Sequence, residues 1–309
     1  MRHSPFVLTS VGAAVALGAA AAQASSRTPV FRTDIELVNV AVTITDAQRH
    51  FVTDLGEGDF EVLEDGKPQE LTLFTHERLP LSLAILIDTS QSMAPKLAQA
   101  QAAAIRFVQT LAASDEAQVV QFNERARIIQ DYTPDQTALE SAIKATRATG
   151  STALYNAVYV GLKDLQARRR AAELRRMAVV VLSDGEDTAS LVSDDQVLSL
   201  ARNSGIAVYG ISLSTPLSSS AALDRDGRPR YFFTALSRDT GGQAHFLQGV
   251  AQLGGVYDQV AEELRSQYSL GYVSKNDQRD GRWRNIQVRL NSRPQLQVRH
   301  KTGYYAPRR

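Results

Sequence analysis

Three short, uninterrupted apolar stretches restrict this chain to few folds. They cover residues 83–87, 177–182 and 206–211, and a segment with helical periodicity follows each of the first two. A strand is apolar at every position only when both of its faces are covered, as in a parallel sheet between two layers of helices. Strands and helices alternate over residues 80–265. This region therefore predicts an α/β fold with a doubly wound, mostly parallel sheet and helices on both faces.

The segments that flank this region have the alternating pattern of half-buried strands instead. Upstream strands are expected at residues 35–44, 60–67 and 71–74, and downstream strands at residues 268–273, 283–290 and 296–300. We expect small antiparallel β segments over residues 25–79 and 266–309, which are candidates for pairing with each other. Residues 214–230 are rich in Ser, Asp, Gly, Arg and Pro and predict an exposed loop, followed by a short helix over residues 232–240.

The N-terminus predicts export. Arg2 and His3 precede an apolar stretch over residues 5–22, and Ala22-Gln23-Ala24 has the small-x-small pattern of a cleavage site. Residues 1–24 are therefore interpreted as a signal peptide, which places the mature protein in the periplasm or outside the cell. The alternative is an uncleaved helix that anchors the protein to the membrane. The chain has no cysteine, which excludes disulfides and zinc sites with thiolate ligands.

Charge and motif content argue against several classes of function. The net charge is +1, and the longest basic run, residues 168–170, has no interleaved aromatic residues, so we expect no nucleic-acid partner. The chain has no P-loop and no H-E-x-x-H motif, and we expect no small-molecule cofactor. None of the five histidines lies in the candidate site described next. We expect no catalytic residues and no enzyme activity, with a hydrolase as the remote alternative.

Oxygen-bearing side chains follow two of the apolar strands. Asp88, Ser90 and Ser92 come directly after residues 83–87, and Asp184 follows residues 177–182. Thr152 precedes another expected helix. Because parallel strands of an α/β sheet place their ligands at the carboxyl ends, these loops are expected to lie at one edge of the sheet. Carboxylate and hydroxyl oxygens are hard donors, which favours Mg²⁺, with Mn²⁺ or Ca²⁺ as alternatives.

The three motifs, D-x-S-x-S at Asp88, T-G-S-T-A-L-Y from Thr149 and S-D-G from Ser183, resemble the von Willebrand factor type A (VWA) domain and its metal-ion-dependent adhesion site. The resemblance implies that Ser90, Ser92 and Thr152 bind the ion directly or through water. It implies that Asp88 and Asp184 bind mainly through water, or directly, depending on state. Residues that would line the rim are Gln91, Tyr155 and Asn156. The flanking segments resemble a bacterial group of exported proteins labelled VWFA-related.

The resemblance implies a function as well as a fold. An ion held mostly by hydroxyls keeps positive charge, and a Glu or Asp side chain of a partner protein can complete its coordination. The chain is thus expected to be an exported adhesion or scaffold module that binds a protein through a divalent cation. In the alternative, the ion only stabilises the fold and the β flanks bind partners.

Overall fold

A computed structural model describes residues 37–168, 175–184, 186–213 and 220–308. A six-stranded sheet forms its α/β region, in the order β10-β9-β8-β5-β6-β7. All neighbours are parallel except β6 and β7. The strands are β5 (Leu81–Asp88), β6 (Glu116–Phe122), β7 (Ala126–Thr133), β8 (Arg176–Ser183), β9 (Ala207–Leu213) and β10 (Ala244–Leu247). The mostly parallel α/β fold predicted from the apolar stretches is confirmed.

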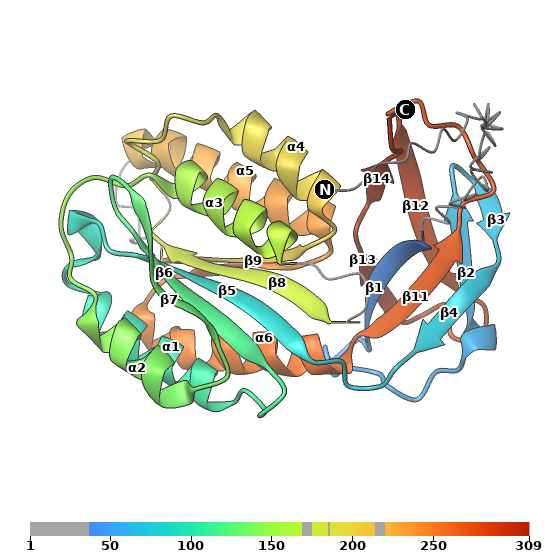
Figure 1. Ribbon diagram of the computed structural model, residues 1–309, viewed down its shortest axis with the longest axis horizontal. Coiled ribbons are helices and arrows are strands. Elements are labelled where there is room, and N and C mark those ends of the chain that lie inside the picture. Colours follow the sequence, from blue (N-terminus) through green and yellow to red (C-terminus); the bar gives the residue numbers. More distant parts are fainter. Residues whose placement is uncertain (1–36, 169–174, 185, 214–219, 309) are drawn as a thin grey trace, which may run out of the picture. The chain divides into compact units, whose positions relative to one another are not determined.

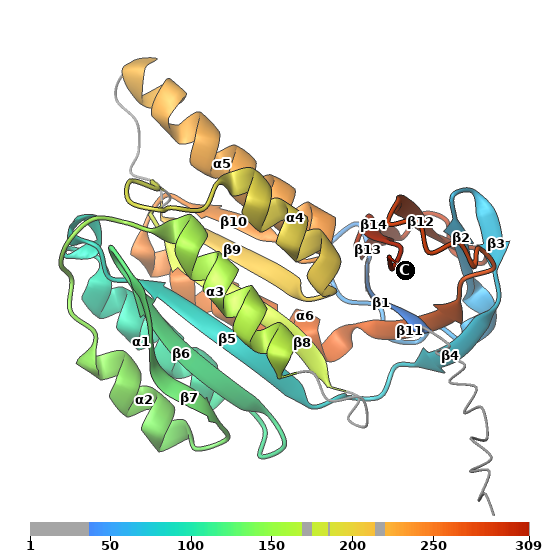
Figure 2. The ribbon, with the colours of Figure 1, turned by 45° about the horizontal axis from the view of Figure 1, so that its top comes forward.

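Helices cover both faces of this sheet (Figure 1). α1, α2 and α6 lie on one face, and α3, α4 and α5 lie on the other, as Figure 2 also shows. Their bounds are α1 (Leu97–Gln109), α2 (Gln136–Ala145), α3 (Leu154–Ala167), α4 (Asp194–Ser204), α5 (Ser220–Thr240) and α6 (Leu253–Ser266). Short 3₁₀ turns are η1 (Glu57–Asp59), η2 (Gln91–Met93) and η3 (Val250–Gln252).

The central strands show why the apolar stretches have no polar interruption. In β5, Leu83 and Ile85 point into the core beneath α1 and α6, whereas Ala84 and Leu86 point into the core beneath α3 and α4. β8 alternates in the same way, with Val180 on the first side. Successive side chains of a strand point to opposite faces, so a strand covered on both faces must be apolar throughout.

The N-terminal and C-terminal flanks together build two further sheets. Their orders are β13-β1-β11-β4 and β14-β12-β2-β3. The strands are β1 (Leu37–Thr45), β2 (Phe60–Glu64), β3 (Lys67–Gln69), β4 (Leu71–Thr75), β11 (Tyr268–Val273), β12 (Trp283–Leu290), β13 (Gln297–His300) and β14 (Gly303–Tyr305). β1 lies between β11 and β13, and β12 pairs with β2. Among the N-terminal strands only β2 and β3 pair directly with each other, so neither flank forms a sheet alone.

Buried polar residues connect the α/β region to the flanking strands. Glu263, at the end of α6, is 1% exposed and accepts hydrogen bonds from Tyr209 Oη at 2.6 Å, Arg299 Nη2 at 2.5 Å and Thr43 Oγ1 at 3.3 Å. These three donors belong to β9, β13 and β1. A buried carboxylate needs such donors, because an unpaired charge away from water is costly.

Arg176 makes a second connection at the start of β8. Its guanidinium donates to the carbonyl of Leu264, to the carbonyl of Gln267 at 3.0 Å and to Ser269 Oγ at 3.1 Å. Burial lowers the pKa of Arg176 to about 10, so the side chain stays charged at neutral pH. The three acceptors span the passage from α6 into β11, and the bonds therefore hold this passage in place.

Two sequence predictions need correction. The segment predicted as a loop over residues 214–230 is helical from Ser220, where α5 begins, although Gly227 and Pro229 are poor helix formers. Extending a helix that is anchored by Phe232 and Phe233 costs less than starting one, which explains how it continues through them. β14 is a strand that the pattern missed. Residues 214–219 and the predicted signal peptide, residues 1–24, lie outside the described residues.

No helix among the described residues has both the length and the apolar character that a bilayer crossing requires.

We expect Glu263→Ala to lower the free energy of unfolding by about 2–3 kcal/mol, because Tyr209 and Arg299 lose their buried acceptor. Urea denaturation followed by circular dichroism measures this change. Glu262→Ala removes the exposed neighbouring carboxylate and is the matched control. Equal midpoints for the two variants would show that the Glu263 contacts contribute nothing to stability.

Candidate metal centre

The site begins where β5 and β8 end side by side. The two strands are parallel neighbours, with Ile87 opposite Leu182. Asp88 is the last residue of β5 and is 0% exposed. Ser183 Oγ, at the end of β8, donates to Asp88 Oδ2 at 2.5 Å. Adjacent strand ends thus bring together residues that are far apart in the chain.

The first loop turns tightly around the Asp88 carboxylate. The Ser90 N–H donates to Asp88 Oδ1 at 2.8 Å, so both carboxylate oxygens have a donor and the group has one orientation. Ser90 Oγ and Ser92 Oγ lie 3.0 Å apart. Ser90 is 1% exposed, whereas Ser92 is exposed. Two hydroxyls close enough to share one ion therefore stand beside a fixed carboxylate, as the D-x-S-x-S motif predicts.

Backbone hydrogen bonds hold the second loop against the first. The Gln91 N–H donates to the Gly150 carbonyl at 2.9 Å, and the Thr149 N–H donates to the Thr89 carbonyl at 2.8 Å. Gly150 has a φ of +73°, a conformation that favours glycine. These bonds join the two loops, and Thr152, two residues after Gly150, is 4% exposed.

The third loop is tied to the second through Thr152. The Thr152 carbonyl accepts from the N–H groups of Thr188 at 2.8 Å and Ala189 at 3.0 Å, and the Thr152 N–H donates to Thr188 Oγ1 at 3.0 Å. Asp187 Oδ1 accepts from the Tyr155 N–H at 3.1 Å, which satisfies a free donor in the first turn of α3. The three loops therefore form one connected unit at the edge of the sheet.

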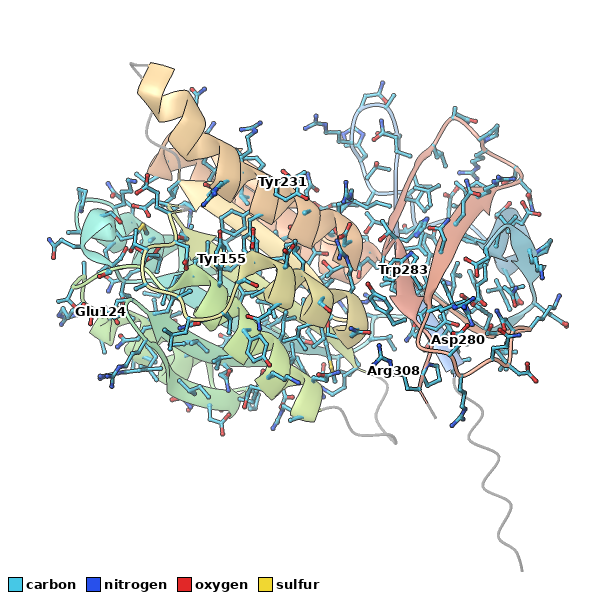
Figure 3. All side chains as sticks on the ribbon, turned by 90° about the horizontal axis from the view of Figure 1, so that it is seen from above. Glu124, Tyr155, Tyr231, Asp280, Trp283 and Arg308 are labelled. Atoms are coloured by element: carbon cyan, nitrogen blue, oxygen red, sulfur yellow. The ribbon has the colours of Figure 1, made fainter. Side chains whose placement is uncertain are left out.

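The predicted rim residues have different surroundings. Gln91 is exposed. The ring of Tyr155 is half-buried and packs on Phe232 of α5, with centroids 4.6 Å apart; Figure 3 labels Tyr155 on the face where α3 and α5 lie. Asn156 Oδ1 accepts from the N–H groups of Leu191 at 3.1 Å and Val192 at 3.2 Å, so its carbonyl group holds the third loop.

Three residues near the site were not assigned these roles from the sequence. Ser183 orients Asp88, Asp187 caps α3, and Lys96 lies beside Asp184. Asp187 carries a usable signal, because an acidic residue in a turn is a common partner for free backbone N–H groups. Ser183 opens the S-D-G motif, but the motif does not say which group its hydroxyl contacts. Lys96 carries no signal, since its role depends on which loops meet.

The Asp88 carboxylate is buried at an electrostatic cost, and one oxygen of Asp184 has no hydrogen-bond partner. Burial raises the pKa of Asp88 to about 6; the Ser183 and Ser90 hydrogen bonds oppose this rise, and the charge of Asp184 adds to it. Asp184 Oδ1 is buried and has no hydrogen-bond partner. Asp184 Oδ2 lies 3.7 Å from Lys96 Nζ. Negative charge is therefore concentrated in a buried place with few donors.

The residues fit a hard divalent cation. A cation would offset the desolvated charge of Asp88 and give Asp184 Oδ1 the partner that it lacks. The described residues contain no group of three or more His, Cys, Asp or Glu side chains placed to hold a metal. Hydroxyl oxygens of Ser90, Ser92 and Thr152 would therefore have to supply much of the coordination, which suits Mg²⁺, Mn²⁺ or Ca²⁺.

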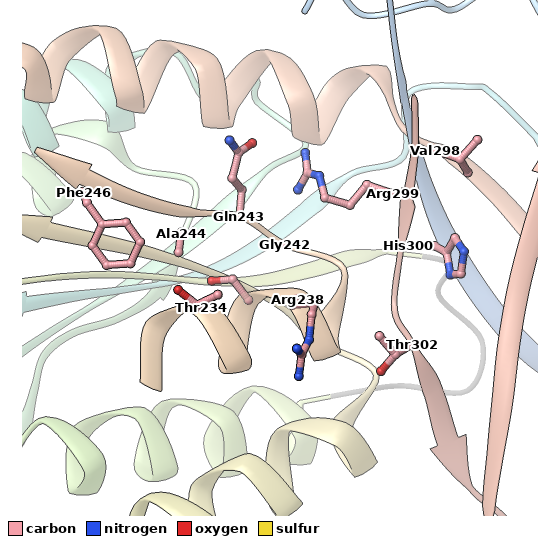
Figure 4. A pocket seen from close by; sticks show the side chains of 11 residues that line it. Thr234, Arg238, Gly242, Gln243, Ala244, Phe246, Val298, Arg299, His300 and Thr302 are labelled. Carbon is pink, nitrogen blue, oxygen red and sulfur yellow. The ribbon is translucent and has the colours of Figure 1, made fainter. Parts of the chain in front are cut away.

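A pocket of about 450 Å³ lies elsewhere, between α5, β10 and β13 (Figure 4). Arg238, Phe246 and His300 are among its lining residues. None of the eight predicted site and rim residues lines it, so this pocket is separate from the candidate metal centre.

Known proteins share part of this sequence. Residues 83–186 match the family model of the von Willebrand factor type A domain. The protein sll0103 from Synechocystis sp. is 30% identical over 113 residues, which are 36% of this chain and 26% of that protein. The chain thus matches only about a quarter of the length of this curated relative.

Two solved structures are similar to this chain at low sequence identity, and the first reaches a TM-score of 0.50. Proximal thread matrix protein 1 from the mussel byssus, with a zinc-occupied MIDAS motif, has a TM-score of 0.50 and 16% identity, over 66% of this chain and 50% of that one. The vWF domain of the type V pili tip protein Mfa5 from Porphyromonas gingivalis has a TM-score of 0.48 and 13% identity, over 60% of this chain and 95% of that one. The family match and the fold agree, and the chain contains a von Willebrand factor type A domain.

Proposed function

We propose that the protein is an exported binding module that holds one divalent cation at Asp88, Ser90, Ser92, Thr152 and Asp184. The observation that carries this proposal is that hydrogen bonds join the three loops that bear these residues, with buried Asp184 Oδ1 left without a partner. Mg²⁺ is the proposed ion, because the donors are oxygens only. The mussel byssus structure, whose MIDAS motif holds zinc, supports a metal at this position of the fold.

The proposed partner is a protein that supplies a carboxylate. Three of the five proposed ligands are neutral hydroxyls, so the ion would keep positive charge. Ser92 and Gln91 are exposed beside the buried donors, which leaves a way for an exogenous Glu or Asp side chain to reach the ion. Family membership supports a role in protein binding. That the protein lacks enzyme activity stays a prediction.

The exported location rests on residues 1–24, whose apolar stretch and Ala22-Gln23-Ala24 site predict a signal peptide. We propose a periplasmic or secreted location, with the uncleaved anchor as the alternative.

Removal of one hydroxyl should weaken metal binding. We expect Thr152→Val, which keeps the side-chain shape, to raise the Kd for Mg²⁺ about 10-fold or more. Isothermal titration calorimetry on protein stripped with EDTA measures the Kd. Thr149→Val removes an exposed hydroxyl of the same loop and should leave the Kd unchanged. A wild-type protein that binds neither Mg²⁺, Mn²⁺ nor Ca²⁺ would disprove the proposed metal centre.

The buried charge of Asp88 makes metal-free stability depend on pH. Its folded pKa of about 6 lies above the ordinary value of 3.8 for an aspartate side chain, so the folded state binds more protons between these pH values. Stability is then highest at low pH within this window and decreases as the pH rises through about 6. The ionised group costs on the order of 2–3 kcal/mol at pH 7.5.

We therefore expect metal-free Asp88→Asn to have a higher Tm than the wild type at pH 7.5 and a similar Tm near pH 4. Saturating Mg²⁺ should raise the Tm of the wild type only. Differential scanning calorimetry in EDTA and in Mg²⁺ checks both statements. If metal-free Asp88→Asn has a lower Tm than the metal-free wild type at pH 7.5, ionised Asp88 does not destabilise the folded state as stated above.

Partner binding should require the ion. We expect protein ligands captured from the exported fraction in Mg²⁺ to be released by EDTA and absent with Thr152→Val bait. An acid-to-amide substitution at the partner's contact residue should abolish capture as well. If Asp88→Ala lowers the Tm in Mg²⁺ but leaves the affinity for the partner unchanged, the ion has a structural role and the β flanks are the binding surface.

A further inference from the structure

Lys96 lies at the candidate metal centre without being one of its oxygen donors. Its ammonium nitrogen is 3.7 Å from Asp184 Oδ2 and donates to the Leu213 carbonyl at 3.2 Å. The side chains are mostly buried, with 21% of Lys96 and 12% of Asp184 exposed. The backbone is also held, since the Lys96 N–H donates to the carbonyl of Met93, which is fully buried. The positive charge therefore has a defined position.

Helix stability does not account for this position. Lys96 is the N-cap residue of α1 and makes no capping hydrogen bond through its side chain. The N-terminus of a helix carries positive partial charge, so it favours anions, and polar acceptors such as Ser or Asp are the preferred caps. A cation at this place opposes the local preference, and such conflicts tend to occur at functional sites.

Lys96 and the ion would meet Asp184 from different sides. The ammonium approaches Oδ2, whereas Oδ1 is buried and has no partner. A separation of 3.7 Å exceeds that of a charge-assisted hydrogen bond, so the interaction is chiefly electrostatic. The ammonium therefore neutralises part of the Asp184 charge from the side of Oδ2, while Oδ1 has no partner.

We propose that Lys96 is a positioning residue that weakens binding of the divalent ion and strengthens the hold of the bound ion on an incoming carboxylate. This inference rests on the proposed metal centre. The first effect follows because two cations repel across a buried distance, where screening is weak. The stronger hold on a carboxylate follows because Asp184, when it also interacts with Lys96, neutralises less of the positive charge of the ion.

The first test is a metal titration of full-length protein stripped with EDTA. We expect Lys96→Met, which keeps the length of the side chain without its charge, to lower the Kd for Mg²⁺ about 5- to 20-fold. Lys96→Arg keeps the charge and should stay near the wild-type Kd. Lys144→Met removes an exposed lysine that pairs with Glu140 on α2, and should change the Kd less than about twofold.

The second test uses acetate as the carboxylate probe. Acetate is titrated into Mn²⁺-loaded protein, and water-proton relaxation reports the displacement of metal-bound water. We expect Lys96→Met to bind acetate at least about threefold more weakly than the wild type. This readout distinguishes a positioning role from a structural one. Loss of a merely structural contact would not raise the affinity for the metal ion and at the same time lower the affinity for acetate.

The outcomes separate the two proposals. A wild type that binds no metal overturns both of them. A wild type that binds metal, with a Lys96→Met Kd that is unchanged or raised, overturns the inference and leaves the metal centre standing. If Lys96→Met fails to fold, Lys96→Gln gives the same comparison with a polar side chain. Unchanged or tighter acetate binding overturns the proposed effect on the partner's carboxylate.

Discussion

The carboxylate of Asp88 is buried where water cannot solvate its charge, and the surrounding loops are arranged around that cost. Ser183 from β8 and the Ser90 N–H each donate to one of its oxygens, which fixes the group but does not neutralise it. The second loop is hydrogen-bonded to the first, and Thr152 joins the second loop to the third. Ionised Asp88 is costly in such a place, and the proposed cation would offset that cost.

Much of this arrangement could be predicted from the sequence. The apolar stretches are long enough to identify buried parallel strands, and their carboxyl ends identify the edge where Asp88 and Asp184 lie. Where the pattern was ambiguous, prediction failed. Gly227 and Pro229 indicate a break, but the apolar anchors at Phe232 and Phe233 are strong enough to extend α5 past them. β14 is only three residues long, too short for a periodicity to be read.

The parts of the site that escaped prediction are those that depend on contacts between loops. In the sequence, Lys96 is an ordinary charged residue at the start of a helix. Its proposed role follows only from its proximity to Asp184 in the structure. Asn156 stays a predicted rim residue, and the sequence does not show that its carbonyl group also holds the backbone of residues 191 and 192. Residue type and spacing identify oxygen donors, whereas the partners that orient them become apparent only when distant segments are brought together.

The connection between the VWA domain and the flanks has a mechanical consequence. The chain enters the domain from β4 and leaves it into β11, and these two strands pair with each other, with Thr75 opposite Ser269. The two chain segments that connect the domain to the flanks, after β4 and before β11, therefore lie at the same end of this antiparallel strand pair. Tension on a ligand held at the sheet edge would load the two strands together along their length, and β1, which hydrogen-bonds to β11, would share that load. Strands pulled along their length must break several backbone bonds at once, so this attachment is suited to resist traction.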